Sequence, residues 1–221
     1  MTFDAATIEM FAVGIWETFY MTALSSLFAY MIGLPLGIIL VVTDKNGIYP
    51  IDWLQKVLGI MINLLRSVPF LILLFIALPL SKIVIGTRVG SPAIVIPLVI
   101  AAAPYVARVV ESSFREVDPG VIEAAQSMGA TPMQIVWKVL LPEAKPSLLV
   151  GAALAITTIL GYSAMSGFVG GGGLGAIAIN YGYYRYQADY MWISVAMLVL
   201  LVQIIQEIGM KLSKAGDKRI R

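Results

Sequence analysis

Three groups of residues have types and a spacing that could support a function. Glycines at positions 170, 172 and 175 satisfy the pattern G-x-G-x-x-G, which can cradle a dinucleotide phosphate. Arg66 is a cation inside a long apolar run, and the segment from Glu123 to Pro142 combines small, apolar and helix-capping residues. Because the chain has no Cys and no His, thiol nucleophiles, zinc sites with Cys or His ligands and the usual Ser-His-Asp triad are excluded. We therefore predict no metal site, and an enzymatic function is disfavoured.

The elements that must position these residues are membrane helices. Apolar residues make up 59% of the 221 and charged residues only 13%, with a mean hydropathy of +0.89, whereas about 25% of a soluble domain is charged. Five apolar runs are each long enough to cross a hydrocarbon core of about 30 Å as a helix. We expect an all-α membrane protein with five transmembrane helices. Its predicted parts are an N-terminal segment 1–17, spans at about 18–42, 57–80, 92–110, 148–169 and 191–210, a loop 111–147 and a basic tail 211–221.

The positive charges predict the orientation of these spans. With the C-terminus in the cytoplasm, only Lys82, Arg88 and Arg185 face outward. The cytoplasmic segments then hold Lys45, Lys56, Arg108, Arg115, Lys138, Lys145, Lys211, Lys214, Lys218, Arg219 and Arg221. The positive-inside rule favours this arrangement, with an external N-terminus. A net charge of +2 is too small to indicate a nucleic-acid partner, so the expected surroundings are the lipid bilayer and other proteins.

The loop 111–147 carries signals for two short helices. Asp118 followed by Pro119 is an N-cap and first-turn pair, and Gly129 suits the left-handed position that ends a helix. Thr131 and Gln134 have the spacing of a capping box, which starts a second helix that we expect Pro142 to end. The loop is therefore predicted to be a helix-turn-helix.

Two uses of this helix-turn-helix are open from the residues alone. It could be an amphipathic hairpin that lies on the bilayer surface. It could also dock on a partner protein, because small residues at its turn allow close approach and it has more apolar side chains than a solvated loop normally exposes. The small residues are Ala124, Ala125 and Gly129, and the apolar ones are Met128, Met133, Ile135, Val136 and Trp137.

The same segment resembles the EAA motif of the permease subunits of ABC importers. That motif reads E-A-A, three residues, G, nine residues, I-x-L-P, and the only departure is Val139 in place of Ile. The resemblance implies that the loop is a coupling helix seated on a separate ATPase subunit. The residues it assigns to coupling are Glu123, Ala124, Ala125, Gly129, Thr131, Pro132, Val139, Leu141 and Pro142. The chain has no Walker A sequence, so ATP and Mg²⁺ are expected on the partner and no cofactor on this chain.

Within that class the sequence is similar to the methionine importer permeases over about residues 15–210. The matching stretches are Trp16–Thr18, Arg66–Phe70, Ala102–Arg108, Gly129–Val136, Gly161–Met165 and Tyr181–Tyr183. The resemblance implies the type I ABC importer permease fold, a homodimer of this chain, two ATP-binding subunits and an external binding protein, often a lipoprotein, that delivers L- or D-methionine. A permease for another amino acid is the alternative within the class. A secondary transporter or a membrane scaffold is more remote, because no carboxylate occupies a span centre and the EAA loop suggests a coupling role.

The translocation path is predicted from the fourth span and Arg66. Small residues at 161–167 surround Tyr162 and Met165, so Met165 could seal a pore between two copies; the alternative is an ordinary packing or lipid-facing side chain. We assign Tyr162, Ser163, Met165 and Arg66 to the path. Arg66 would face a helix-lined cavity near the broken geometry that Pro69 introduces. It could instead snorkel to the membrane surface from a span whose cytoplasmic end starts later. The glycine run 170–173 follows a span and not a strand, which disfavours dinucleotide binding. We expect this run to break the helix as a hinge or mouth loop. The alternative is that its glycines allow close helix packing.

Overall fold

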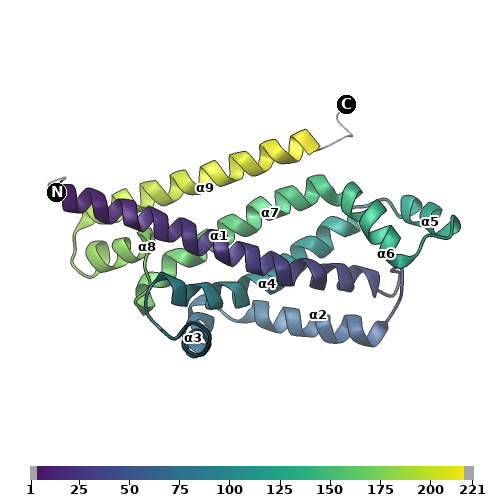
Figure 1. The fold of residues 1–221 in the computed structure, drawn as a ribbon, viewed down its shortest axis with the longest axis horizontal. Helices are drawn as coiled ribbons and strands as arrows, with labels where there is room; N and C mark the ends of the chain where they lie inside the picture. Colours follow the sequence, from purple (N-terminus) through teal and green to yellow (C-terminus); the bar gives the residue numbers. More distant parts are fainter. Residues whose placement is uncertain (1–3, 217–221) are drawn as a thin grey trace. The chain divides into compact units, whose positions relative to one another are not determined.

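The computed structural model describes residues 4–216, and all regular structure in that range is helical (Figure 1). The helices in chain order are α1 (Ala5–Val42), α2 (Asp52–Ser67), α3 (Phe70–Ile85), α4 (Ser91–Arg115), α5 (Pro119–Ser127), α6 (Pro132–Ile135), η1 (Val136–Leu140), α7 (Leu141–Ser163), η2 (Ala164–Val169), α8 (Leu174–Ile177), η3 (Ala178–Tyr183) and α9 (Ala188–Gly216). The predicted all-α class is confirmed. Part of the predicted basic tail, namely Lys218, Arg219 and Arg221, lies outside the described residues.

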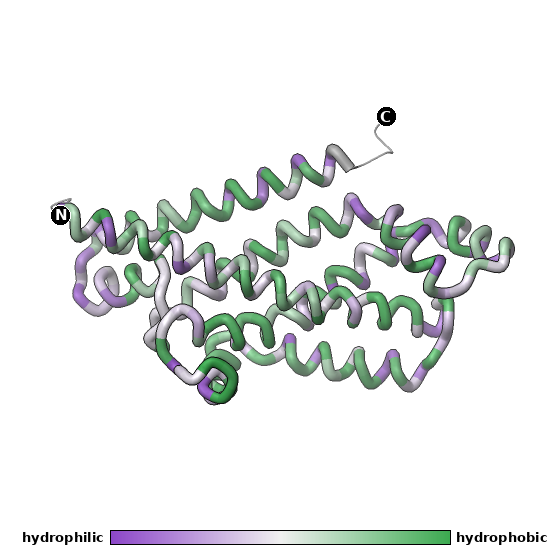
Figure 2. The backbone as a smooth tube through the Cα atoms, viewed as in Figure 1, coloured by the Kyte–Doolittle hydropathy of each residue, from purple (hydrophilic) through white to green (hydrophobic). Residues whose placement is uncertain are grey.

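Four long helical segments among the described residues are apolar enough to cross a membrane. They are Ala5–Val42, Ser91–Arg115, Pro132–Val169 and Ala188–Lys214, and the bent pair α2–α3 raises the number to five if it forms one span. Figure 2 shows that hydrophobic residues predominate along α1, α3 and α9. All five candidates coincide with the predicted runs, although the helices extend beyond the predicted ends. The first helix already begins at Ala5, inside the segment 1–17 that was predicted to precede the first span.

The predicted second span over residues 57–80 is interrupted at Pro69. Helix α2 ends at Ser67, α3 begins at Phe70, and the chain bends by 105° at this break. Pro69 explains the break because a proline has no N–H to donate and disfavours helical geometry in the residue before it, here Val68. A hydropathy window averages over this position and does not detect the interruption.

The expectation that Pro142 ends the loop's second helix is wrong. The helical segment that starts at Pro132 passes through Pro142 and continues to Val169. The turn just before the proline, η1, is a π-helical turn, in which the N–H of Leu141 donates to the carbonyl of Val136. A wider turn shifts the hydrogen-bond register next to the proline, so the missing N–H at Pro142 does not terminate the helix.

The chain divides into two compact units. Within the described residues the first unit comprises the residues up to Phe28, Val68–Ala102 and Ile156–Gln206. The second comprises Ala29–Ser67, Ala103–Ala155 and the residues from Glu207 onward. Buried Phe11, Leu174 and Ile177 form a core cluster in the first unit, and Leu40, Ile62 and Ala107 form one in the second.

Local interactions explain several helix ends and contacts. Asp4 caps α1 by accepting a 3.0 Å hydrogen bond from the backbone N–H of Thr7, and hydrogen bonds from the Thr7 side chain and backbone lower the pKa of Asp4.

Gly33 and Gly37 pack against α4 in the second unit. A Cβ atom at Gly33 would lie 2.7 Å from the carbonyl oxygen of Ala103, which explains why this position in α1 has no side chain.

Candidate functional site

The helix-turn-helix of the loop 111–147 begins as its sequence predicts. Asp118 precedes α5, and its Oδ1 accepts a 2.8 Å hydrogen bond from the N–H of Gly120. Pro119 occupies the first turn, where a helix needs no backbone donor. The predicted start of the first helix is confirmed.

The turn between α5 and α6 depends on Gly129. Its φ is 78°, in the left-handed region, and its N–H donates to the carbonyl of Gln126 at 2.9 Å. The N–H of Ala130 donates to the carbonyl of Ala125 at 3.1 Å, so the two bonds form a Schellman motif. A Cβ at Gly129 would have open space within 4 Å, which leaves the backbone conformation as the reason for glycine.

The second helix starts with the predicted capping box. Thr131 Oγ1 accepts from the N–H of Gln134 at 3.4 Å, and Gln134 Oε1 accepts from the N–H of Thr131 at 2.9 Å. Pro132 is the first residue of α6, and Val139 lies in η1. Leu141 and Pro142 begin α7, so the end of the motif belongs to the long helix that follows.

Burial divides the helix-turn-helix into an inner and an outer face. The buried side chains are Ala125, Ile135, Val136 and Leu140. The exposed apolar side chains are Val121, Met128, Met133 and Trp137, with Met128 81% exposed. Of the predicted coupling residues, Glu123, Ala124, Gly129, Thr131, Pro132 and Pro142 are exposed, Val139 and Leu141 are half-buried, and Ala125 is buried. Exposed apolar side chains grouped on one short element are typical of an interaction surface.

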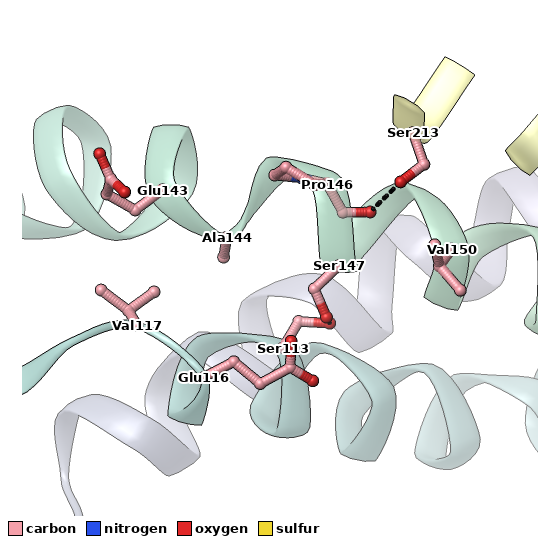
Figure 3. Close-up of a pocket in the computed structure, with 9 residues that line it drawn as sticks. All are labelled: Ser113, Glu116, Val117, Glu143, Ala144, Pro146, Ser147, Val150 and Ser213. Carbon is pink, nitrogen blue, oxygen red and sulfur yellow. Dashed lines mark hydrogen bonds between the residues drawn. The ribbon is translucent and has the colours of Figure 1, made fainter. Parts of the chain in front are cut away.

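The two ends of the loop 111–147 meet at its base (Figure 3). Ser147 Oγ donates a 3.1 Å hydrogen bond to Ser113 Oγ, and Ser213 Oγ on α9 donates to the carbonyl of Pro146 at 2.9 Å. These residues line a cavity of about 360 Å³ together with Glu116 and Glu143. The loop is therefore closed by side-chain hydrogen bonds and does not hang free from α4 and α7.

A charged network in the second unit was missed by the sequence reasoning. Glu111 of α4 is buried, and its two carboxylate oxygens pair with Arg108 at 2.5 Å and with Arg115 at 2.9 Å. The spacing of three and four residues between these charges was a visible signal, because such pairs share one face of a helix.

Three of the predicted path residues lie together in the first unit. Tyr162, in the last turn of α7, is half-buried, and its ring stacks on Phe70 with centroids 4.4 Å apart. Ser163 is buried and donates to the carbonyl of Leu160 at 2.7 Å, so its hydroxyl is used within its own helix. Met165 lies in the 3₁₀ turn η2 and is 37% exposed. The gate assignment stays a prediction.

Arg66 lies in the second unit and not deep within a helix. It occupies the last turn of α2, where a cation interacts favourably with the helix dipole. Its side chain is exposed, and the guanidinium carbon lies 5.9 Å from the centroid of the Tyr105 ring. The break at Pro69 therefore places Arg66 at the end of a helix and not in the middle of a straight span.

The glycine run ends the fourth long helix, as predicted, but it is closely packed. Gly170 has a φ of 73° at the end of η2. A Cβ at Gly171 would lie 2.6 Å from the Cβ of Ser166, and one at Gly173 would lie 2.7 Å from Oγ1 of Thr18. The contacts favour close packing over a hinge, and no nucleotide-type strand–turn–helix is present in residues 4–216.

Comparison with known proteins gives consistent matches. The family described as "Binding-protein-dependent transport system inner membrane component" matches residues 33–219. A protein of Vibrio cholerae serotype O1, named a probable D-methionine transport system permease protein MetI, is 46% identical over 215 residues, which cover 97% of this chain and 96% of the relative. The D-methionine transport system permease protein MetI of Escherichia coli K12 is 46% identical over 154 residues, which cover 70% of this chain and 71% of the relative.

A solved structure gives the same result at the level of the fold. It describes inward-facing conformations of the MetNI methionine ABC transporter. The matched chain superposes with a TM-score of 0.95 at 43% sequence identity, covering 97% of this chain and all of that one.

Proposed function

Because the chain belongs to the family of inner-membrane components of binding-protein-dependent transport systems, we propose that it is the permease subunit of an ATP-driven methionine importer. The names of its relatives, at 46% identity over nearly the whole chain, support methionine as the substrate, in the L- or D-form. The role of the chain is to form the translocation path, which requires no catalytic residue.

The helix-turn-helix α5–α6 is the observation that carries this proposal. Its exposed Met128, Met133 and Trp137 provide an apolar surface that a water-exposed loop would not retain without a partner. The partner we propose is a separate ATP-binding subunit, which holds ATP and Mg²⁺. The name of the MetNI transporter as an ABC transporter supports this assignment.

The complete assembly in this proposal contains two copies of the chain, two ATP-binding subunits and an external methionine-binding protein, which can be a lipoprotein. The chain lies in the bacterial inner membrane as a multi-pass protein, with the N-terminus outside and the C-terminus in the cytoplasm. The distribution of Lys and Arg supports this orientation.

The chain's own contribution to transport is mechanical. Movement of the ATP-binding subunits would displace the docked hairpin, and the segment from Pro132 to Val169 would carry the displacement, because it is helical throughout. The path then alternates between access from outside and access from inside, and hydrolysis in the partner resets it. Pro142, the last residue of the coupling motif, lies within this helical segment next to the π-helical turn η1. The motif is therefore continuous with the long helix that follows it.

Uptake by the reconstituted complex tests the proposal. Vesicles with this chain, its ATP-binding subunit and the external binding protein should take up labelled L- or D-methionine only when ATP is supplied. Unlabelled amino acids added in excess test the substrate, and stronger competition by another amino acid than by methionine would identify a permease for that amino acid. Uptake driven by an ion gradient without ATP would indicate a secondary transporter, and no uptake under any condition would indicate a scaffold.

A further inference from the structure

The buried carboxylate of Glu111 connects three segments of the second unit. Its side chain is 7% exposed, and it receives Arg108 on one oxygen and Arg115 on the other. A buried charge is tolerated when it is paired and hydrogen-bonded, and two arginines satisfy both carboxylate oxygens here. Removal of Glu111 would leave two cations on one face of α4 without their shared counter-ion.

Arg108 connects Glu111 to helix α2. Its guanidinium donates to Oδ1 of Asn63 at 2.8 Å and to the backbone carbonyl of Gly59 at 3.1 Å. Gly59 has no side chain, and a Cβ there would lie 3.6 Å from Arg108 Nη2, so the guanidinium lies directly against the α2 backbone. Arg108 thus links α4 to α2 through two hydrogen bonds.

Arg115 connects the same carboxylate to the turn between α1 and α2. Its Nη2 donates to Oδ2 of Asp44 at 2.5 Å. Both residues line a cavity of about 430 Å³ whose other walls include Glu123 and Gln126 of α5. The Arg115–Asp44 pair therefore faces the same cavity as α5, the helix in which the coupling motif begins. Arg115 also lies only three residues before Asp118, the N-cap of α5.

We propose that Glu111 is a positioning residue for coupling. It holds the base of the docking hairpin, the helix-turn-helix formed by α5 and α6, to α2 through Arg108 and to the α1–α2 turn through Arg115 and Asp44. The inference rests on the proposed function. Through this network, displacement of the hairpin moves α2 and the end of α1 together with α4, in addition to the direct route through α7. Rigid charge pairs suit this role because they resist changes in both distance and direction.

The half-exposed Arg115–Asp44 pair makes it possible to test coupling and folding separately. Arg115 is 52% exposed and Asp44 25% exposed in their side chains, and ion pairs with this much solvent contribute little to stability. If the Arg115–Asp44 pair only stabilised the fold, its loss would have almost no effect. If it transmits movement, its loss should uncouple ATP hydrolysis from uptake while the protein stays folded.

The test uses the complete complex in vesicles and compares Asp44→Asn, Arg115→Gln, the double variant and Glu111→Gln with the unsubstituted chain. Glu116→Gln, an exposed carboxylate beside Arg115, is the matched control. The measurements are ATP hydrolysed per methionine imported, retention of the ATP-binding subunit, and the thermal unfolding midpoint. We expect the ratio of ATP to methionine to rise about threefold to tenfold in Asp44→Asn and in Arg115→Gln, with unchanged retention of the ATP-binding subunit in both. The unfolding midpoint should stay unchanged in Asp44→Asn, which leaves both arginines paired with Glu111. The double variant should be no worse than Arg115→Gln, because Arg115→Gln already loses the contact with Asp44 as well as the one with Glu111.

The outcomes separate the two proposals. Suppose that the unsubstituted complex imports methionine and that Asp44→Asn and Arg115→Gln leave the ratio of ATP to methionine unchanged. The proposed role of Glu111 is then overturned, while the proposed function stands. A fall in the unfolding midpoint of Asp44→Asn that accounts for its lost uptake also overturns that role, since the network would then be structural. If the unsubstituted complex hydrolyses ATP but does not import methionine, the proposed function itself is overturned, and this inference with it.

Discussion

The backbone N–H of Gly173 donates a 2.7 Å hydrogen bond to Oε2 of Glu17, which lies 156 residues earlier in α1. The next residue of each segment repeats the contact, with Thr18 Oγ1 accepting from the N–H of Leu174 at 2.9 Å. Gly173 is the N-cap of α8 and has no side chain that could satisfy these donors. The first turn of α8 is therefore capped by side chains of another helix.

Replacing Glu17 should destabilise this contact measurably. In Glu17→Ala the N–H of Gly173 loses its acceptor, which should lower stability by about 1–3 kcal/mol. Glu17→Gln keeps an acceptor oxygen and should lose less. Thermal unfolding of the detergent-solubilised protein measures both, with Glu9→Ala, an exposed carboxylate on the same helix, as the control. Equal unfolding midpoints for Glu17→Ala and Glu9→Ala would contradict the capping role.

The conformation of Gly129 predicts a selective loss of transport. Its φ of 78° costs a β-branched residue more than the about 1–2 kcal/mol that an ordinary L-residue loses there, so Gly129→Val should distort the turn and abolish uptake. Gly129→Asn should retain much of the activity, because Asn tolerates this region. Gly120→Ala in α5, where φ is not positive, serves as the control. Normal uptake by Gly129→Val would show that the turn geometry has no part in coupling.

Glu123 is expected to contact the ATP-binding subunit directly. It is exposed, and its backbone carbonyl already accepts a 2.9 Å hydrogen bond from Ser127 Oγ, so Glu123→Ala should leave α5 helical. The expected result is weaker retention of the ATP-binding subunit in pull-down and about tenfold slower uptake, the loss that follows from one charge-assisted hydrogen bond. Gln126→Ala, one turn away on the same helix, should retain the partner normally. Unchanged retention in Glu123→Ala would leave the hairpin as a surface element.

Features that depend on neighbours along the chain could be predicted from the sequence, and features that depend on distant contacts could not. The caps at Asp118 and Thr131 and the left-handed Gly129 were predictable, because each depends on partners within six residues along the chain. The pairing of Glu17 with Gly173 was not, since nothing near Glu17 indicates which backbone it will meet. The network around Glu111 falls between these cases: its helical spacing is visible in sequence, but its contacts with Asp44 and Asn63 require the tertiary fold.

Two prolines in apolar segments have opposite effects on their helices. Pro69 breaks the helix near Arg66, where the sequence indicates broken geometry, although the hydropathy of the run alone predicts one span. Pro142 was expected to end a helix and does not, because the π-helical turn before it accommodates the missing donor. A proline in an apolar helix therefore predicts an irregularity, while the surrounding packing decides whether the chain bends or continues.

The chain's lack of cysteine allows a direct test of its orientation. Tyr186, 92% exposed between η3 and α9, is predicted to lie outside, and Met128, 81% exposed in the docking hairpin, in the cytoplasm. A membrane-impermeant maleimide should label Tyr186→Cys in intact cells and Met128→Cys only after permeabilisation. Labelling of Met128→Cys in intact cells would reverse the predicted topology.

Met165 tests where the pore closes. It is 37% exposed in the tight turn η2, between the half-buried Tyr162 and the closely packed Gly167, so its side chain can reach a second copy or lipid without disturbing either neighbour. If two copies place this residue at their axis, Met165→Ala should open a gap of several methylene volumes and let small solutes leak without ATP, or raise the ATP hydrolysed per methionine. Phe168→Ala, on the same turn and 46% exposed, removes a larger apolar group and is the matched control. A tight resting membrane and an unchanged ATP-to-methionine ratio in Met165→Ala would make Met165 a packing or lipid-facing residue and place the gate elsewhere in the path.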